Sequence, residues 1–375
     1  MCNGSTLYPT MSRSSIAFVW LVVLASGVAC GGGRSDAGDG GAADVAPGTP
    51  LTGTPGVWTW IDVPGMTCDD GTPTGIAINP APAGAAGGGD LLVYFMGGGA
   101  CWDASTCFVL NTAVHGPYGR AQWEASGAPS IAHALDRARA TNPYRAASYV
   151  FVPYCTGDFH AGDNVASYDV LGPRPFHHVG RRNVEAFLPR VRATWPAPAR
   201  VVMSGSSAGG FGATLNYARF RDTYPDAAMS LVDDAGPMLE GSGIPADERA
   251  AWYASWHLGD VVDPLCAGCA ADLSLLYPAL TARHPRDRMA LLTSLQDAVI
   301  GAYFLIPLAA DVELRMRALI TDRIAPSAAF RAFVIPGTSH TLLGGIDSIT
   351  SGGMTLETWL TRMHDGDPTW ATVGL

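Results

Sequence analysis

The chain has 375 residues, which is enough for one large α/β domain or two ordinary ones. Hydrophobic residues make up 48% of it and charged residues only 15%, so a sizeable core can form and wholesale disorder is excluded. The formal net charge is −10, and no cluster of Lys and Arg lies among aromatic residues. This composition argues against nucleic acid as a partner.

The first segment, residues 1–30, has the pattern of an export signal. A basic residue, Arg13, precedes an apolar run at 16–28 that is too short and too rich in small residues for a membrane span. Cys30 follows this run at the position of the lipidated cysteine of a bacterial lipoprotein, although Gly27 replaces the usual Leu three residues earlier. The sequence therefore predicts a membrane-anchored lipoprotein, with free secretion as the alternative.

The next segment, residues 31–54, consists mostly of Gly, Ala, Asp, Pro and Thr. Such a composition predicts a flexible tether that lies outside the fold. From residue 55 to 375 the sequence contains no linker and no internal repeat. We therefore expect this part to form a single domain.

Six apolar runs of strand length recur along this domain, and helix-like stretches such as 179–192 and 212–221 lie between them. Strands that alternate with helices predict a mostly parallel, doubly wound sheet flanked by helices, of the α/β-hydrolase kind. Polar residues follow the strands at their C-terminal ends, where open α/β sheets place their sites. The predicted strands are residues 90–95, 147–153, 200–203, 229–232, 288–293 and 330–335.

One of these strands runs directly into a G-x-S-x-G motif with Ser207 at its centre. The flanking positions are Gly205 and Gly209, and Ala208 and Gly210 are also small. A strand, a G-x-S-x-G turn and a helix-compatible segment together indicate a nucleophile elbow. We therefore expect Ser207 to be a nucleophile at a helix N-terminus, where free N–H groups favour developing negative charge.

A serine hydroxyl needs a base to take its proton, and in this fold the chain order is serine, acid, histidine. Of the histidines after Ser207, only His340 follows a predicted strand within a loop of small residues. The sequence therefore predicts His340 as the base. The alternative is that His340 is an ordinary loop histidine, a description that also fits His284.

Two candidates exist for the acid that orients the base. Asp297 follows the predicted strand at 288–293, and its place in the order of strands favours it. Asp233 and Asp234 end the preceding strand. This pair is the alternative, and it could instead form a turn or helix cap or line the site.

An oxyanion hole needs at least two preorganised backbone donors. The N–H of Ala208, which follows the nucleophile, is one candidate. The glycine run at 97–99 offers others, because a backbone without side chains can approach a ligand closely. The same run could indicate phosphate binding, but the chain has no G-K-[ST] and no spaced G-x-G-x-x-G motif at this point.

Six cysteines lie beyond the export signal, an even number that suits disulfide bonding in an exported protein. The short spacings make Cys101–Cys107 and Cys266–Cys269 plausible local pairs, which leaves Cys68 and Cys155. The alternative for Cys266 and Cys269 is half of a zinc site or a redox motif. Neither a second C-x-x-C nor a histidine pair accompanies them, which favours a structural disulfide.

Several residues near the predicted strand ends are candidates for substrate contact. Trp102, Tyr154 and Phe159 could stack on sugar rings, although each could equally be a core residue. Asp158 could line the site or be an ordinary loop residue. The same two interpretations remain open for the neighbouring pair of histidines, His177 and His178.

These motifs, taken in order, resemble the pectin acetylesterase family. The resemblance implies a carboxylesterase without metal or other cofactor that uses Ser207, Asp297 and His340. It also implies Gly98, Gly99 and Ala208 as oxyanion donors, and the three disulfides Cys68–Cys155, Cys101–Cys107 and Cys266–Cys269. The segments that carry the resemblance are residues 96–102, 154–158, 204–210, 234–237, 295–297, 339–340, 358–360 and 366–370.

The function expected from this sequence is hydrolysis of O-acyl esters, with O-acetyl groups on a polysaccharide such as pectin as the substrate. Ser207 would attack the ester carbonyl and form an acyl-enzyme, which water then resolves. One alternative is a fatty-acyl or general short-chain esterase that uses the same residues. Another is a non-catalytic, surface-tethered protein that binds carbohydrate. We expect an exported enzyme that meets a membrane only through the lipid anchor.

Overall fold

The computed structural model describes residues 46, 48–85, 89–126 and 132–375. The predicted export signal at 1–30, with Cys30, lies outside these residues, as does most of the predicted tether. Within the described part of the chain, no helix is both long and apolar enough to cross a membrane.

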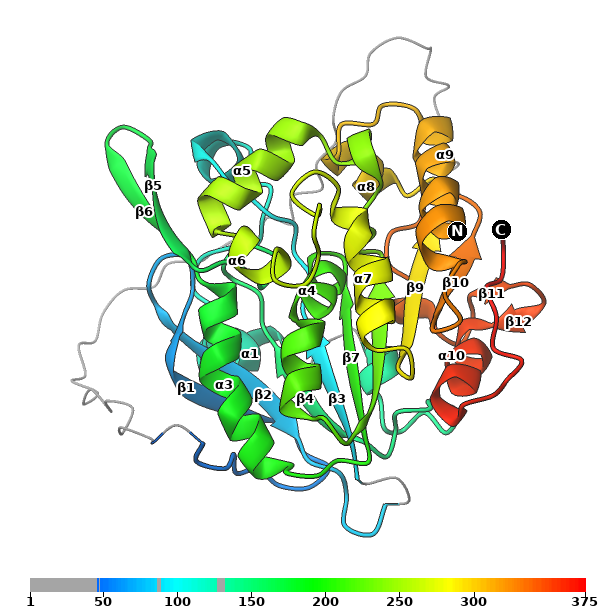
Figure 1. Cartoon of the computed structure of the whole chain (residues 1–375). Helices are drawn as coiled ribbons and strands as arrows, with labels where there is room; N and C mark the ends of the chain where they lie inside the picture. Colours follow the sequence, from blue (N-terminus) through cyan, green and yellow to red (C-terminus); the bar gives the residue numbers. More distant parts are fainter. Residues whose placement is uncertain (1–45, 47, 86–88, 127–131) are drawn as a thin grey trace, which may run out of the picture. The chain divides into compact units, whose positions relative to one another are not determined.

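The described residues form an eight-stranded sheet in the order β1-β2-β4-β3-β7-β8-β9-β10 (Figure 1). The pairs from β4 to β10 are parallel, and β2 is antiparallel to both of its neighbours. Two short hairpins, β5–β6 and β11–β12, lie outside this sheet. The strands of the sheet are β1 (Thr59–Thr67), β2 (Pro73–Asn79), β3 (Asp90–Phe95), β4 (Ser148–Val152), β7 (Arg200–Ser206), β8 (Ala228–Asp234), β9 (Arg288–Ser294) and β10 (Phe330–Ile335), and those of the hairpins are β5 (Asn164–Asp169), β6 (Pro173–His178), β11 (Thr350–Ser351) and β12 (Met354–Thr355).

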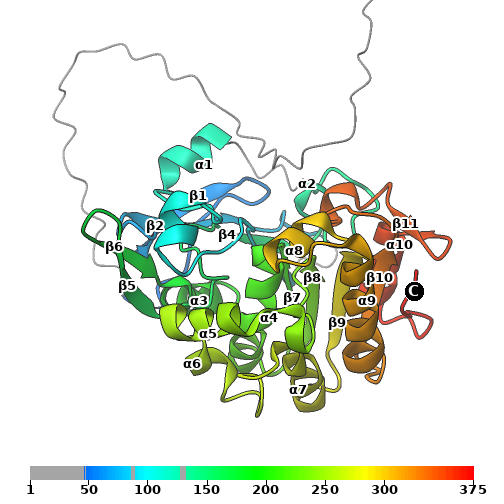
Figure 2. The same ribbon diagram turned by 90° about the horizontal axis from the view of Figure 1, so that it is seen from above.

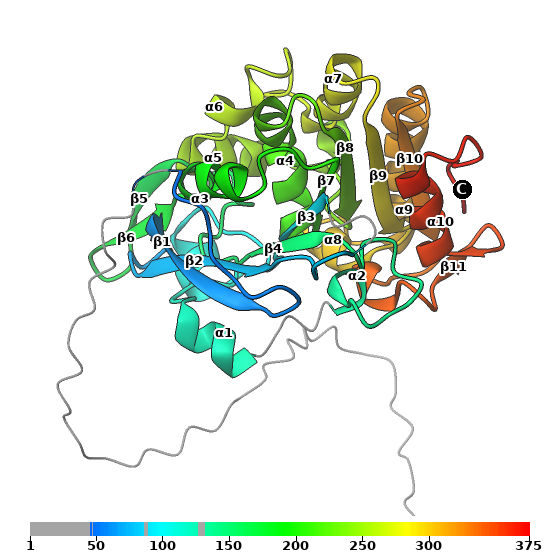
Figure 3. The ribbon, with the colours of Figure 1, turned by 90° about the horizontal axis from the view of Figure 1, so that it is seen from below.

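Helices cover both faces of the sheet. Figure 2 places α3 to α7 along one face, and Figure 3 places α1 and α2 along the other. The helices are α1 (Arg120–Ser126), α2 (Ala132–Leu135), α3 (Gly180–Thr194), α4 (Ala208–Thr223), α5 (Ala246–Trp256), α6 (Gly259–Val262), α7 (Leu276–Arg283), α8 (Ala298–Tyr303), α9 (Ala309–Leu319) and α10 (Leu356–Asp365). The mostly parallel, α/β-hydrolase-like sheet expected from the sequence is therefore confirmed.

The core divides into two layers because successive strand residues point to opposite faces of the sheet. On β3, Leu91 and Val93 join the cluster that contains Phe187 of α3. Leu92 joins a separate cluster with Trp359 of α10 on the other face. Central strands such as β3 and β4 are buried on both sides, which explains their uninterrupted apolar runs.

The six predicted strands all form, each within a few residues of its expected bounds. The strands β1 and β2, which begin the sheet, and the hairpin β5–β6 were not predicted. The hairpin strand β5 alternates between half-buried and exposed residues, so it lacks the apolar run that marked the central strands. The expected helix at 212–221 begins earlier, at Ala208, directly after the G-x-S-x-G serine.

The ordered domain also begins earlier than expected. Leu51, which the sequence analysis placed in the tether, is buried in the core layer beside α3. Its N–H donates to Thr194 Oγ1 over 2.7 Å, and the carbonyl of Thr49 accepts a hydrogen bond from Arg190. The end of the predicted tether is therefore part of the fold.

Three disulfides connect the described part of the chain, Cys68–Cys155, Cys101–Cys107 and Cys266–Cys269. These are the pairs that the family resemblance implies. The bond between Cys266 and Cys269 supports the disulfide interpretation over a zinc or redox motif. Disulfides of this kind fit an exported protein.

Candidate active site

The turn between β7 and α4 has the geometry of a nucleophile elbow. Ser207 has a φ of 59° and a ψ of −126°, and α4 begins at the next residue. A Cβ at Gly205 would overlap the carbonyl oxygen of Gly209, and a Cβ at Gly209 would overlap that of Phe95. Both positions therefore require glycine, because neighbouring backbone atoms leave no room for a side chain. The serine, in a strained conformation, lies at the tip of the turn.

His340 connects Ser207 to Asp297. The His340 Nε2 atom lies 2.8 Å from Ser207 Oγ, and the Nδ1 atom lies 2.8 Å from Asp297 Oδ2. Ser207 follows β7, Asp297 follows β9 and His340 follows β10. The C-terminal ends of these parallel strands lie at the same edge of the sheet. A histidine between a hydroxyl and a carboxylate can take the hydroxyl proton and remain oriented while it does so.

The Asp297 carboxylate is fixed by the start of α8. This residue caps the helix, and its Oδ1 atom accepts hydrogen bonds from the N–H groups of Val299 and Ile300. Its side chain is fully buried. One oxygen therefore holds the helix and the other is left for His340. Of the two acids considered from the sequence, Asp297 is the one that contacts the histidine.

The glycine run after β3 lies beside the serine. Gly98 has a φ of +151°, and a Cβ on it would come within 2.9 Å of both Tyr154 and Val114. Gly99, with a φ of +72°, would carry a Cβ that overlaps the carbonyl oxygen of Thr112. Ala208 is the first residue of α4, so its N–H has no acceptor within the helix.

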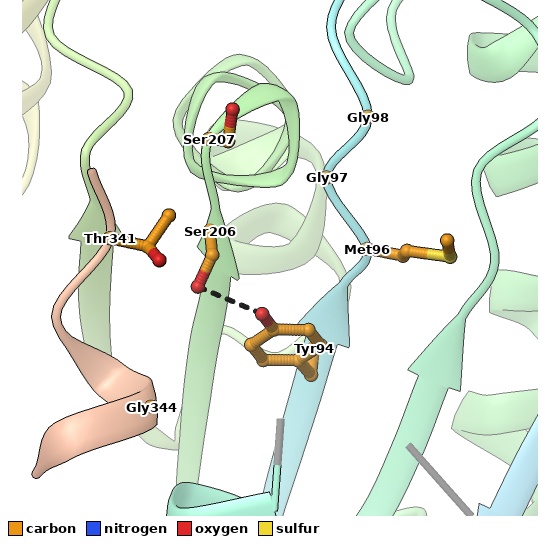
Figure 4. Close-up of a pocket in the computed structure, with 8 residues that line it drawn as sticks. All are labelled: Tyr94, Met96, Gly97, Gly98, Ser206, Ser207, Thr341 and Gly344. Carbon is orange, nitrogen blue, oxygen red and sulfur yellow. Dashed lines mark hydrogen bonds between the residues drawn. The ribbon is translucent and has the colours of Figure 1, made fainter. Parts of the chain in front are cut away.

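A cavity of about 350 Å³ opens at the serine (Figure 4). In Figure 4 the Ser206 side chain points toward Tyr94, whereas that of Ser207 points away from it. One wall belongs to the loop that follows His340 and another to the glycine run. The lining residues are Tyr94, Met96, Gly97, Gly98, Ser206, Ser207, Thr341 and Gly344.

The sequence matches the model of the pectinacetylesterase family over residues 59–274, which is more than half of the chain. The chain belongs to the pectinacetylesterase family. The family resemblance proposed from the sequence is thereby confirmed.

Two curated proteins similar to this pectinacetylesterase-family chain have carboxylesterase names. Palmitoleoyl-protein carboxylesterase notum2 of Xenopus laevis is 28% identical over 191 residues, which cover 49% of this chain and 36% of the relative. Palmitoleoyl-protein carboxylesterase NOTUM of Drosophila melanogaster is 26% identical over 166 residues, which cover 42% of this chain and 23% of the relative. The matches thus span about a third of the Xenopus relative and less than a quarter of the Drosophila relative.

A buried hydrogen-bond chain not expected from the sequence lies under the cavity of this family member. The Tyr94 hydroxyl donates to Ser206 Oγ over 2.8 Å, and Ser206 Oγ donates to Asp234 Oδ2 over 2.5 Å. Burial raises the pKa of Asp234 to about 6, although hydrogen bonds and the nearby His340 act to lower it. The sequence analysis left the role of Asp234 open because strand order alone does not reveal what a strand's last side chain contacts.

The neighbouring Asp233 points away from the site. Its carboxyl accepts hydrogen bonds from the N–H of Gly236 and from the hydroxyls of Thr214 and Tyr277. Burial raises the pKa of Asp233 to about 8. This residue therefore helps to hold α4 and α7 on the sheet and does not line the cavity.

The burial of Tyr154 and Asp158 argues against the substrate contacts expected for them. The Tyr154 hydroxyl donates to the carbonyl of Gly99 and accepts from the N–H of Phe159, so this side chain stabilises the conformation of the glycine run. Asp158 accepts hydrogen bonds from Thr156 and from three backbone N–H groups. Both side chains are fully buried.

The remaining aromatic candidates differ in exposure. Phe159 is buried and stacks on Phe211 with ring centroids 4.4 Å apart, so it belongs to the core. Trp102 is only partly buried and packs against Trp252 and Tyr303. It is the one of the three sequence candidates whose ring remains partly open to solvent.

The two adjacent histidines, His177 and His178, contact residues other than Ser207. His178 is buried, where it contacts the Tyr168 hydroxyl and the carbonyl of Thr156. It also lies near Cys101 and Cys107, a grouping that could suit a metal. Those two sulfurs are joined in a disulfide, and zinc binds thiolates, so this donor set does not fit a metal. His177 is partly exposed on β6.

Proposed function

We propose that this enzyme is a serine carboxylesterase in which Ser207, His340 and Asp297 form the catalytic triad. The observation that carries the proposal is the unbroken contact from Asp297 through His340 to Ser207, with both distances at 2.8 Å. The elbow conformation of Ser207 supports it independently. An intact triad also disfavours the alternative of a non-catalytic carbohydrate-binding protein.

In the proposed mechanism, His340 Nε2 takes the proton of Ser207 while Oγ attacks the ester carbonyl carbon. The N–H groups of Ala208, Gly98 and Gly99 are proposed to hold the resulting oxyanion. His340 then gives the proton to the leaving alcohol oxygen, and the carbon–oxygen ester bond breaks to leave an acyl-enzyme. Water, deprotonated by His340, attacks the acyl-enzyme, and Ser207 recovers its proton as the acid is released.

The cavity supports a compact alcohol such as a sugar residue. The leaving oxygen must lie beside His340 to receive its proton, so the wall formed by Thr341 and Gly344 is on the leaving-group side. The volume of about 350 Å³ lies at the lower end of the range for small-molecule sites. Trp102, near the glycine run, is proposed to stack on a neighbouring ring of an acylated polysaccharide such as pectin.

The aromatic packing behind the serine supports a small acyl group, most simply acetyl. Phe211, one turn into α4 from Ser207, is buried against Phe159 and lies near Phe304. Trp252 is buried against Phe159 and Phe304 as well. Closely packed rings leave an extended chain little space without rearrangement.

A second candidate is a fatty-acyl esterase that uses the same triad. It is favoured by exposed aliphatic side chains on the segments around the site, among them Val114 with 46% of its surface exposed and Leu305 with 78%. Val114 donates a hydrogen bond to the Gly98 carbonyl, and Leu305 lies just after α8. The palmitoleoyl-protein names of the two relatives point the same way.

Hydrolysis of a p-nitrophenyl ester series from acetate to palmitate tests both candidates. We expect the highest kcat/KM with acetate and no hydrolysis above background by Ser207→Ala. The control is Ser242→Ala, which should keep wild-type activity, since Ser242 is exposed and accepts a hydrogen bond from Arg315. A maximum at palmitate would favour the fatty-acyl candidate, and an active Ser207→Ala variant would contradict the proposed triad.

We also propose that the chain is exported and anchored through Cys30, with residues 31–45 as a tether. The three disulfides support an oxidising compartment. Expression in a bacterium with an alkynyl fatty acid should label the wild type and leave Cys30→Ser unlabelled. A wild type that is exported without label would support free secretion instead.

A further inference from the structure

The backbone of Asp234 meets the nucleophile elbow directly. In the parallel pairing of β7 with β8, Ser206 and Asp234 are register partners at the ends of their strands. The next residue, Ser207, donates its N–H to the Asp234 carbonyl oxygen over 2.7 Å. The main chain of β8 therefore supports the strained serine at the tip of the elbow.

The side chain of Asp234 reaches the histidine loop. Its Oδ1 atom accepts the N–H of Leu342 over 2.6 Å, and its Oδ2 atom accepts the N–H of Leu343 over 3.2 Å. The same Oδ2 accepts the Ser206 hydroxyl over 2.5 Å. One fully buried carboxylate thus receives donors from both segments that must meet for Ser207 to contact His340.

The loop that Asp234 holds is conformationally strained. Thr341, between His340 and the two bonded leucines, has a φ of +63°. That region is unfavourable for a β-branched residue, so such a conformation persists only where its surroundings impose it. The two N–H groups bonded to Asp234 directly follow this residue, and they restrict how the loop can relax.

We propose that Asp234 is a positioning residue that fixes the His340 loop to the nucleophile elbow and, as an anion, stabilises the His340 imidazolium during the reaction. This inference rests on the proposed triad and adds a fourth residue that acts through His340 without touching the substrate. It is separate from the role of Asp297, which contacts the imidazole itself.

The charge of Asp234 should appear in the pH dependence of the reaction. The charges that act on it are those of His340 on its loop and of the adjacent Asp233 on β8, and Tyr94 on β3 is linked to it through Ser206. Asp297 faces His340 from the other side. Since burial raises the pKa of Asp234 to about 6, the carboxylate gains a proton in the acidic range where His340 must stay neutral to act as a base.

The test compares pH profiles of kcat on p-nitrophenyl acetate for two variants. Asp234→Asn removes an anion that favours protonation of the nearby imidazole, so the acidic limb of the profile moves to lower pH. Ser206→Ala removes a hydrogen bond that favours the ionised carboxyl, so the pKa of Asp234 rises and the acidic limb moves to higher pH. A purely structural role would lower kcat equally at every pH and would not produce opposite shifts.

The size of the effect is the second readout. We expect kcat of Asp234→Asn to fall about 100-fold with KM nearly unchanged, as for a misplaced catalytic group. Asp233→Asn is the matched control, because it alters a buried carboxyl at the end of the same strand. The partners of this carboxyl lie on α4, on α7 and in the loop that follows β8. It should keep the wild-type kcat and acidic limb.

The outcomes separate this inference from the proposed function. An active Ser207→Ala would overturn the triad, whereas an inactive Ser207→Ala together with a wild-type-like Asp234→Asn would overturn only the role of Asp234. If Asp234→Asn does not fold, the pH profile of Ser206→Ala alone tests the role of Asp234. An acidic limb that moves upward supports the proposal, and one that is unmoved or moves downward contradicts it.

Discussion

The two carboxylate oxygens of Asp297 have different partners. Oδ1 caps α8 through two backbone N–H groups, and Oδ2 lies 2.8 Å from His340 Nδ1. An asparagine at this position could still cap the helix with its carbonyl oxygen. It would place an NH₂ group, a donor, where the imidazole N–H needs an acceptor.

We therefore expect Asp297→Asn to reduce kcat by about 10⁴-fold through the wrong imidazole tautomer. The thermal midpoint should change little, because the cap is retained. Kinetics on p-nitrophenyl acetate and a melting curve on the same preparation check both parts. An Asp297→Asn variant with near-wild-type kcat would mean that another acid orients His340.

Local motifs were sufficient to predict which three residues the structure brings into contact. Ser207 is marked by its flanking glycines, and His340 and Asp297 by their places after strands. For Tyr154 and Asp158 substrate contact and a structural role both stayed open, because their sequence context shows polar groups near a strand end and does not show burial. Asp234 could not be assigned, since its partners at 342 and 343 are brought to it by tertiary packing.

At the scale of elements, the three disulfides close loops of very different lengths. Cys68 and Cys155 are 87 residues apart and tie the turn after β1 to the end of β4. Cys266 and Cys269 are only three residues apart. Chain entropy predicts greater stabilisation from the longer loop.

Replacing both Cys68 and Cys155 by Ser should therefore lower the free energy of unfolding by about 4 to 5 kcal/mol. The double replacement of Cys266 and Cys269 serves as the control and should lower it by about 1.5 kcal/mol. Urea denaturation of the two variants measures the difference. Equal losses would show that the effect comes from native-state contacts of the cysteines and not from loop closure.

The central strands could be predicted because they are buried on both faces and therefore read as continuous apolar runs. The same signal is weak for β5, which alternates in burial, and it did not indicate the edge strand β1 or its neighbour β2. The start of the fold was misplaced for a related reason. Leu51 is a single apolar residue in a polar stretch, and only its packing near α3 shows that it belongs to the core.

At the scale of the whole molecule, buried carboxyl groups make stability depend on pH. Burial raises the pKa of both Asp233 and Glu248 to about 8. The folded protein therefore keeps their protons at pH values where the unfolded chain, with ordinary carboxyl pKa values near ~4, has lost them. This contribution is fully present below about pH 4 and is lost as the pH rises through 8.

Asp233→Asn removes one of these titrations, because an amide does not ionise. We expect the thermal midpoint of the wild type to fall between pH 5 and pH 9 more steeply than that of the variant. The difference between the two curves isolates Asp233 from all other ionisable groups. Parallel curves would contradict a raised pKa at this position.

The proposed nucleophile, Ser207, can be identified by covalent labelling. The most direct measurement is reaction with a p-nitrophenyl phosphonate, followed by peptide mass spectrometry to locate the covalent adduct. We expect one adduct per chain, on Ser207, with hydrolysis lost in proportion, and no adduct in His340→Ala. An adduct on a different residue, or full esterase activity after Ser207 is modified, would contradict it.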